Sequence, residues 1–352
     1  MGTDQPKVPG TTAGLDAADP GPQDPNAGPE NPRPRPENLR PGSAADLRRR
    51  ADQLPPGHPS SPVEADGRRK PPAPRLQDIA LPEPLTDTEH AEHVKDVRDG
   101  LDKARVRGLP TEEQHTIDTD HAAWDAERRI AHDSIIATLY SRASNVPCER
   151  RAIIAGGLTG AGKSTVLDHH AGIDRSQYLT INPDTIKEKM AENGLIPVVD
   201  GLSPMEASDL VHEESSHIAK RLAVQAQADG RNVIWDVTMW SRTSTEQRVN
   251  ELRAAGYASI QGVFVDIPVE LAVTRADARY REGHDDYRIG KGYGGRFVPE
   301  EVIRAQADLE WGSVNRKTFE AVKGRFDSWA RYDNSAAAPV IKDAGHGKEE
   351  TS

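Results

Sequence analysis

One short stretch of this sequence has the residue types and the spacing of a phosphate-binding loop. From Gly157 to Ser164 it reads G-x-x-x-x-G-K-S, and it follows the apolar run 152–155. Glycines let the backbone curl so that successive N–H groups converge on phosphate oxygens at the start of a helix. In such a loop the lysine, here Lys163, reaches the β- and γ-phosphates, and the serine hydroxyl binds Mg²⁺. The stretch predicts a site for ATP and Mg²⁺. Its expected nucleotide-binding residues are Gly157, Leu158, Thr159, Gly160, Ala161, Gly162, Lys163, Ser164 and Thr165.

A carboxylate follows the next expected strand. Asp184 comes after the run 178–181, at the start of an expected helix. Thr185 and Glu188 have the T-x-x-E spacing of a capping box, and Asn182 before Pro183 is a second possible cap, so Asp184 is not needed as a cap. A carboxylate at this place can accept the proton of a hydroxyl that attacks the γ-phosphate. Asp184 is therefore the candidate general base and substrate contact.

A second carboxylate, Asp236, closes the hydrophobic run 233–235. An acid at the end of such a strand holds Mg²⁺ directly or through water in P-loop proteins. Thr238 lies two residues later and points the same way along an extended chain. We expect Asp236 to contact metal and substrate, and Thr238 to contact substrate.

Arginines flank a glycine-rich segment, 283–296. Arg279 precedes it and Arg296 ends it, while Arg275 and Arg281 lie on the same expected helix as Arg279. Such glycine density predicts a mobile loop whose arginines close on the transferring phosphoryl group. Arg279 and Arg296 are the candidates, and at least one of Arg275 and Arg281 is expected to face solvent.

The segment His212-Glu213-Glu214-Ser215-Ser216-His217 contains several residue types that bind metals. Two histidines five positions apart do not share a helix face, and the pattern is not H-E-x-x-H. A zinc protease is therefore excluded. Glu213 or Glu214 either lines the acceptor pocket or belongs to a solvated helix face.

Strands and helices alternate from residue 152 onward, and they must position these side chains. Strands are expected at 152–155, 178–181, 232–237, 259–267 and 329–332, and helices after the P-loop, from 185, at 204–229, 244–255 and 269–281, and from 299. This order predicts an α/β fold of the P-loop kinase type, a parallel sheet with helices on both faces. Ligands then bind at the carboxyl ends of the strands.

Composition divides the chain into four parts. Residues 1–80 hold 17 of the 27 prolines and no Phe, Trp or Tyr, so we expect 1–85 to be a disordered tail. A helical extension is expected at 86–148, punctuated at Gly100 and Gly108, and its apolar stripe should pack on the following domain. The P-loop kinase domain is expected at 149–336, followed by a C-terminal tail, 337–352.

Charge and cysteine content narrow the partners and the compartment. The net charge is −11, and the first 80 residues balance 11 basic against 11 acidic groups, so the remainder is acidic. This disfavours nucleic acid and anionic membranes as partners. Cys148 is the only cysteine, which excludes an internal disulfide, and no run has membrane-spanning length. We expect a soluble cytoplasmic protein.

From residue 150 to 335 the chain resembles the zeta toxin family of P-loop kinases. The resemblance rests on the P-loop and on several shorter motifs in the same order. These are Ile181-Asn182-Pro183-Asp184-Thr185-Ile186-Lys187, Asn232-Val233-Ile234-Trp235-Asp236-Val237-Thr238, Ala278-Arg279-Tyr280, Gly295-Arg296-Phe297-Val298-Pro299-Glu300-Glu301 and Tyr332-Asp333-Asn334. Trp240 stands about where some members carry a substrate-contacting arginine, and Arg242 is near it.

The resemblance implies an ATP-dependent phosphotransferase acting on the 3′-hydroxyl of UDP-N-acetylglucosamine. It also implies that Lys163 and Ser164 bind ATP and Mg²⁺, that Asp184 is the base, and that Arg279 and Arg296 stabilise the phosphoryl group. A small antitoxin protein is an expected partner. Two alternatives stay open: a kinase of another acceptor, such as a nucleoside, an antibiotic or a polynucleotide end, and a non-catalytic ATP-binding regulator.

Overall fold

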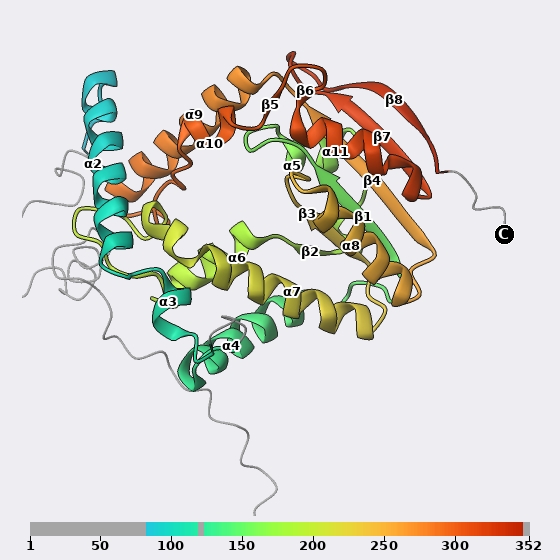
Figure 1. Cartoon of the computed structure of the whole chain (residues 1–352), viewed down its shortest axis with the longest axis horizontal. Coiled ribbons are helices and arrows are strands. Elements are labelled where there is room, and N and C mark those ends of the chain that lie inside the picture. Colours follow the sequence, from blue (N-terminus) through green and yellow to red (C-terminus); the bar gives the residue numbers. More distant parts are fainter. Residues whose placement is uncertain (1–81, 119–122, 348–352) are drawn as a thin grey trace, which may run out of the picture.

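A central sheet of mostly parallel strands organises the protein (Figure 1). The computed structural model describes residues 82–118 and 123–347, so the expected disordered tail lies outside the described residues as far as position 81. The sheet strands are β1 (Arg151–Gly156), β2 (Leu179–Ile181), β3 (Val233–Asp236), β4 (Ser259–Asp266), β7 (Ser328–Asp333) and β8 (Val340–His346). Their order is β2-β3-β1-β4-β7-β8; the first five are parallel, and β8 pairs antiparallel with β7.

Helices cover both faces of this sheet, as the sequence predicts. They are α5 (Lys163–His169), α6 (Pro183–Glu192), α7 (His212–Ala228), α8 (Arg242–Ala254), α9 (Val269–Arg288), α10 (Glu300–Arg304) and α11 (Val314–Val322). Because side chains alternate along a strand, β1 serves both layers. Ile154 is buried in the core that includes α6, α7, α8 and α11, and Ile153 is buried in the core that includes α5 and α9. The α/β fold of the P-loop kinase type is confirmed.

Three helices form the N-terminal extension: α2 (Asp87–Val106), α3 (Thr111–His115) and α4 (Ala126–Arg142). A capping box starts α2, with the Glu89 N–H donating to Thr86 Oγ1 at 3.3 Å and the Thr86 N–H donating to Glu89 Oε2 at 2.8 Å. The expected break at Gly100 is wrong, because α2 continues through it. A Cβ at Gly100 would lie 3.0 Å from Leu202 Cδ1, so the small residue permits a close approach of the chain.

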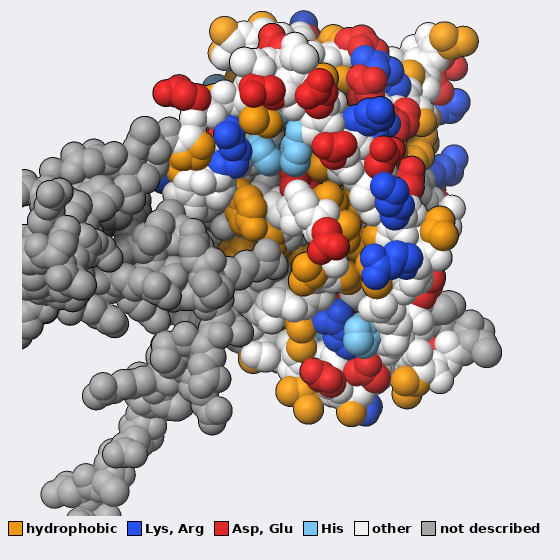
Figure 2. Space-filling model, turned by 90° about the vertical axis from the view of Figure 1, so that its left-hand side faces the viewer, with side chains coloured by type: hydrophobic (Ala, Val, Ile, Leu, Met, Phe, Trp, Pro, Cys, Tyr) orange, Lys and Arg blue, Asp and Glu red, His pale blue; other side chains and the backbone are white. Residues whose placement is uncertain are grey.

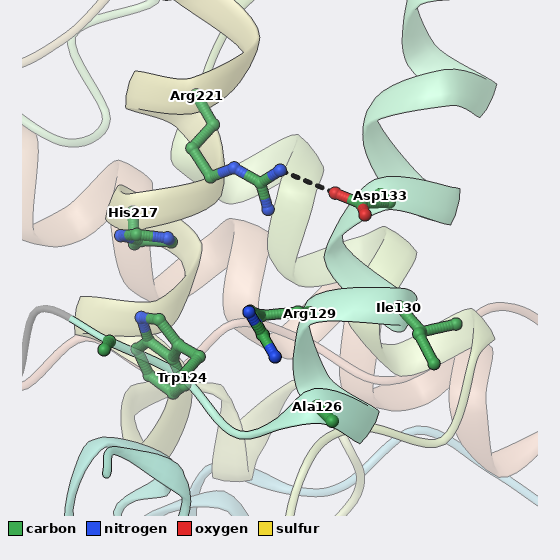
Figure 3. A pocket seen from close by; sticks show the side chains of 8 residues that line it. Trp124, Ala126, Arg129, Ile130, Asp133, His217 and Arg221 are labelled. Atoms are coloured by element: carbon green, nitrogen blue, oxygen red, sulfur yellow. Dashed lines mark hydrogen bonds and ion pairs between the residues drawn. The ribbon is translucent and has the colours of Figure 1, made fainter. Parts of the chain in front are cut away.

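The extension packs on the sheet domain, as its apolar stripe predicts. Ile135 and Ile136 of α4 are buried in the same core as α7, whereas Ile130 is 72% exposed. Arg221 Nη2 of α7 donates to Asp133 Oδ1 of α4 at 2.5 Å, an ion pair that Figure 3 shows from close by.

The expected start of α6 is wrong. The helix begins at Pro183, two residues before Thr185, and its N-cap is Asn182, whose Oδ1 accepts the Asp184 N–H at 2.8 Å. Proline at the first helical position has a backbone angle suited to the helix and needs no N–H partner. The capping box proposed for Thr185 and Glu188 is therefore not formed.

The segment 283–296 is less of a loop than its glycines suggest. Helix α9 extends to Arg288 rather than ending at Arg281. A Cβ at Gly283 would lie 2.7 Å from Gly295 Cα, so this glycine allows the returning chain to touch the helix. Close packing, and not a break in the helix, explains Gly283.

Three further boundaries differ from expectation. The segment 204–229 is a 3₁₀ helix, η3 (Glu206–Val211), followed by α7, and the expected tail 337–352 contains β8. A small hairpin, β5 (Ala307–Asp308) and β6 (Gly312–Ser313), and α11 were not predicted. None of the helices within 82–118 and 123–347 is both long and apolar enough to span a membrane.

Candidate active site

The P-loop connects β1 to α5, and its glycines have conformations that other residues rarely adopt. Gly157, Gly160 and Gly162 have φ angles of 140°, 85° and 81°. A Cβ at Gly160 would lie 2.7 Å from the Ala272 carbonyl oxygen, and one at Gly157 would overlap the Val265 carbonyl oxygen. The loop is thus fixed by backbone conformation and by the neighbouring strand β4 and helix α9.

Asn334, just after β7, braces the same loop. Its side chain is 7% exposed, and its Nδ2 donates to the Ala161 carbonyl oxygen at 2.8 Å. A Cβ at Gly162 would overlap this amide group. Asn334 belongs to the motif near the end of the chain, and this contact gives that motif a physical role.

The carboxyl ends of β2 and β3 bring polar groups to the P-loop lysine. Lys163 Nζ lies 3.6 Å from Asp236 Oδ1 and 3.4 Å from the Gly157 carbonyl oxygen. Asn182 Nδ2 donates to Asp236 Oδ2 at 3.0 Å. The Asp236 side chain is 9% exposed and, like Ser164, lines the central cavity. Hydroxyl and carboxylate oxygens are the ligand types that Mg²⁺ prefers, so Ser164 and Asp236 suit this ion.

Asp184 and Arg296 form an ion pair across the cavity, although they come from α6 and from the chain between α9 and α10. The Asp184 side chain is 41% exposed, so the carboxylate stays accessible from the cavity. The bidentate geometry available to arginine makes it suited to hold a carboxylate or a phosphate. The two residues were expected at one site, and the structure brings them together.

Helix α9 divides its arginines between the cavity and the outside. Arg275 and Arg279 line the cavity, whereas Arg281 Nη2 pairs with Asp87 Oδ1 at 2.8 Å. Burial and the nearby Arg296 lower the pKa of Arg279. Two guanidinium groups held so close favour an anion between them. Arg281 thus points away from the cavity, but it is ion-paired and its side chain is 30% exposed, so the expected solvated helix face is found only in part.

These groups surround one central cavity of about 940 Å³. The predicted site residues that line it are Thr159, Gly160, Ala161, Gly162, Lys163, Ser164, Thr165, Asp184, Asp236, Thr238, Arg279 and Arg296. Gly157 and Leu158 do not line the cavity. Leu158 is 1% exposed and packs in the hydrophobic core. The cavity is at the carboxyl ends of the parallel strands, where α/β proteins bind ligands.

The acidic pair of α7 does not line this cavity. Glu213 is 59% exposed, and Glu214 is fully buried with its Oε1 2.7 Å from His132 Nε2. His212 lines the central cavity, while His217 lines a separate pocket of about 560 Å³ between α4 and α7, with Trp124 and Arg129 (Figure 3). The two histidines therefore cannot share a metal, and the rejection of a zinc protease agrees with the structure.

Several cavity residues have no signal in the sequence motifs that identify the P-loop. From α2 come Leu101 and Arg105, from η3 Ser208 and Asp209, and from the start of α8 Ser244, Thr245 and Arg248. Arg242, which is near Trp240 in the sequence, donates to Glu246 Oε1 at 2.9 Å on its own helix. Arg248 is the arginine of α8 that reaches the cavity.

Two cationic side chains in this part of the cavity are shielded from solvent, Lys187 almost fully and Arg248 partly. Lys187 is 5% exposed, and no described residue forms an ion pair with it. Burial lowers the pKa of Lys187, and Asp184 acts in the opposite direction. Burial likewise lowers the pKa of Arg248, which stacks 5.1 Å from the centre of the Trp235 ring. A buried cation without an acidic partner is the arrangement expected where an anionic ligand binds.

Fold and site together define a protein of the P-loop kinase class. The family model for the zeta toxin matches residues 140–327, more than half of the chain. The chain belongs to the zeta toxin family. No curated protein matches it significantly.

Solved structures agree with this fold. The native AvrRxo1-ORF1:-ORF2 complex is 14% identical, with a TM-score of 0.51, and the match covers 68% of this chain and 79% of that one. The same complex with ATP is 15% identical, with a TM-score of 0.50 and coverage of 66% and 76%. The PezAT chromosomal toxin–antitoxin system of Streptococcus pneumoniae is 14% identical, with a TM-score of 0.43 and coverage of 62% and 82%.

Proposed function

We propose that this protein transfers the γ-phosphate of ATP to a hydroxyl group of a small molecule, and that the acceptor is a nucleotide sugar such as UDP-N-acetylglucosamine. The carrying observation is the pairing of Asp184 with Arg296 in the cavity that the P-loop also lines. A base, a phosphoryl-binding cation and a phosphate-binding loop in one cavity are what phosphoryl transfer to a hydroxyl requires.

The residues divide the work according to their chemistry. The P-loop backbone and Lys163 hold the β- and γ-phosphates, and Arg279 and Arg296 neutralise charge on the phosphoryl group as it moves. Asp184 leaves Arg296 when the arginine turns to the phosphate, and it accepts the proton of the acceptor hydroxyl. Bound at Ser164 and Asp236, Mg²⁺ would supply charge neutralisation at the phosphates.

The walls away from the P-loop favour an anionic acceptor. Buried Lys187 and half-buried Arg248 line the cavity, and Arg105 lies at the α2 side of the same space. Trp240 is 47% exposed and also lines the cavity, where its ring can stack on a base or sugar. Diphosphate, base and sugar in one molecule match this combination of cations and an indole ring.

The test is transfer of label from γ-labelled ATP, with Mg²⁺, to a panel of nucleotide sugars and nucleosides. We expect wild type to label UDP-N-acetylglucosamine, and Asp184→Asn to lower the rate by at least about 100-fold, since general bases contribute about that much or more. Glu192→Gln is the matched control, because Glu192 is also on α6 but pairs with Lys189 at 2.5 Å and does not line the cavity.

The outcomes separate the open alternatives. Label on a nucleoside or another small molecule would keep the kinase and reject the nucleotide sugar. Tight ATP binding without transfer to any acceptor would contradict a kinase and favour an ATP-binding regulator. Equal loss in Glu192→Gln would mean that α6 is disturbed as a whole and would reject Asp184 as the base.

A protein partner is also part of the proposal. AvrRxo1-ORF1 was solved in a complex with AvrRxo1-ORF2. We propose that this chain likewise pairs with a second protein, a small antitoxin. Co-purification of the native protein from its own cells, followed by identification of a stoichiometric second chain, tests this. Recovery of this chain alone would contradict it.

A further inference from the structure

Three side chains from three separate elements bring metal-ligand atoms together near the active site. His93 comes from α2, Glu206 from η3 and His284 from α9, and their donor atoms all lie within 4.8 Å of one another. His93 Nε2 is 2.6 Å and His284 Nδ1 is 3.0 Å from the same oxygen, Glu206 Oε1. Within 82–118 and 123–347 this is the only such group of three.

Donors crowd this one oxygen. Tyr280 Oη also donates to Glu206 Oε1 at 2.8 Å, while Ser203 N–H donates to Oε2 at 2.7 Å. One carboxylate oxygen offers about two lone-pair positions, so three donors exceed its capacity. A cation between the two rings and the carboxylate resolves the excess, because each imidazole then presents a lone pair to the cation instead of an N–H to the oxygen.

Burial and charge at this cluster also suit a cation. Glu206 is 1% exposed, so its carboxylate needs cationic or hydrogen-bonding partners within the protein. The rings of His93 and His284 are 4.1 Å apart between centroids, close enough for two imidazolium charges to repel each other. One dication held by two neutral rings and a carboxylate avoids that repulsion.

We propose that His93, Glu206 and His284 bind one divalent transition cation of the Zn²⁺ class. Two imidazole nitrogens and one carboxylate oxygen are a common three-ligand set for zinc, with water as the fourth ligand. Tyr280 and Ser203 hold the carboxylate from outside, the role that hydrogen-bonding partners of metal ligands play. Neither the P-loop nor Asp236 takes part, so this site is independent of the proposed kinase reaction.

The position of the site gives it a structural role. His93 connects α2 to Glu206 of η3, and His284 and Tyr280 connect α9 to the same carboxylate. Tyr280 directly follows Arg279 in the sequence. The chain that leads to Arg296 passes against the same place, because a Cβ at Gly295 would overlap the Tyr280 carbonyl oxygen. Figure 2 shows histidine side chains at two separate places on one face of the molecule. A bound cation would therefore fix α2 beside the segments that carry Arg279 and Arg296.

The experiment is titration of the chelator-treated full chain with Co²⁺, followed by visible absorption. We expect about one Co²⁺ per chain with the strong visible bands of a four-coordinate ion, displaced by Zn²⁺, and a higher melting temperature with Zn²⁺. His93→Ala and His284→Ala should weaken binding by at least about 100-fold, and Tyr280→Phe by about 10-fold.

Two variants make the test decisive. His90 is one turn from His93 on α2, but its Nε2 pairs with Asp277 Oδ1 at 3.0 Å, so His90→Ala should bind Co²⁺ as wild type does. His93→Gln keeps a hydrogen-bond donor beside Glu206 and should fold while losing the Co²⁺ bands. No Co²⁺ bands in wild type, unchanged bands in His93→Gln, or equal loss in His90→Ala would each overturn the proposal.

Discussion

The two sides of the central cavity are built in different ways. The nucleotide side is one continuous stretch, 157–165, whose shape depends on three glycines with positive φ and on the brace from Asn334. The proposed acceptor side is lined by side chains of α2, α6, η3, α7 and α8, which do not form one sequence motif. One side depends on backbone conformation and the other on side chains brought together by packing.

This difference predicts what each side tolerates. The phosphates of ATP never differ, and backbone N–H groups bind them. Because these groups belong to the backbone, a change of side chain does not remove them. An acceptor differs from enzyme to enzyme, and side chains on separate elements can change without disturbing the loop. We infer that the nucleotide side sets the reaction and the acceptor side sets the substrate.

Loss of a phosphoryl-binding arginine is expected to have the largest effect, because it acts where both sides meet. Arg279→Ala should lower kcat by about 10³-fold, the scale for an arginine that stabilises phosphoryl transfer. Affinity for ATP should change much less. Steady-state rates and isothermal titration of ATP measure the two effects separately.

Arg281→Ala is the matched control, since Arg281 lies on the same helix but pairs with Asp87 outside the cavity. Its kcat should stay within about 2-fold of wild type, as an exposed ion pair contributes little. If Arg281→Ala loses as much as Arg279→Ala, the effect belongs to α9 as a whole and not to the cavity.

Lys187→Met should weaken acceptor binding and raise the stability of the fold. The buried ammonium has no ion-pair partner among the described residues, so methionine should weaken acceptor binding, seen as a rise in KM of about 10-fold or more, with ATP binding unchanged. The same change should raise the free energy of unfolding at pH 7 by about 1 kcal/mol, because a desolvated charge is removed.

The sign of the pH dependence follows from the lowered pKa of Lys187. Between its folded and unfolded pKa values the unfolded chain binds more protons, so wild-type stability rises with pH there. The gain in the free energy of unfolding from Lys187→Met is therefore largest below the pKa of Lys187 in the folded protein. It decreases as the pH rises toward the pKa of an ordinary lysine. Lys189→Met, where the lysine pairs with Glu192, should be destabilised at pH 7 instead. Urea denaturation across pH distinguishes these outcomes.

The same division explains which parts of the molecule the sequence predicts. Local motifs and strand order point to the P-loop, Asp184, Asp236, Arg279 and Arg296. The sequence does not identify three other cavity residues, Lys187, Arg248 and Arg105. Only the packing of α6, α8 and α2 shows which of the many charged residues face the cavity.

Element ends were the weaker part of the fold prediction, for local reasons. Glycine predicted a break at Gly100 and a loop from Gly283, yet both residues lie inside helices where another chain segment comes close. Asn182 with Pro183 started α6 earlier than the competing capping box. The edge strand β8 contains only exposed and half-buried residues, without a clear alternation of buried and exposed positions. Its sequence therefore resembles that of a tail.

Asn334→Ala tests whether the nucleotide side depends on its brace. Without the hydrogen bond to the Ala161 carbonyl oxygen the loop should lose order, and the KM for ATP should rise by about 10-fold while the KM for the acceptor stays the same. Asn193→Ala is a suitable control, because its Nδ2 also donates to a backbone carbonyl, that of Lys189 at 2.7 Å, away from the cavity. A change in the acceptor KM alone would contradict the division between the two sides.

Arg105→Gln should have the smallest effect and concerns only the acceptor side. Arg105 is 44% exposed and its Nη2 pairs with Asp209 Oδ2 at 2.6 Å, so its loss should cost less than about 1 kcal/mol of stability. Its place in the cavity wall predicts a rise in the acceptor KM of about 2- to 5-fold at low salt, which fades as salt screens the charge. Arg107, on the same extension but outside the cavity lining, provides the control variant Arg107→Gln. An unchanged acceptor KM in Arg105→Gln at low salt would remove α2 from the acceptor side and leave it a purely structural element.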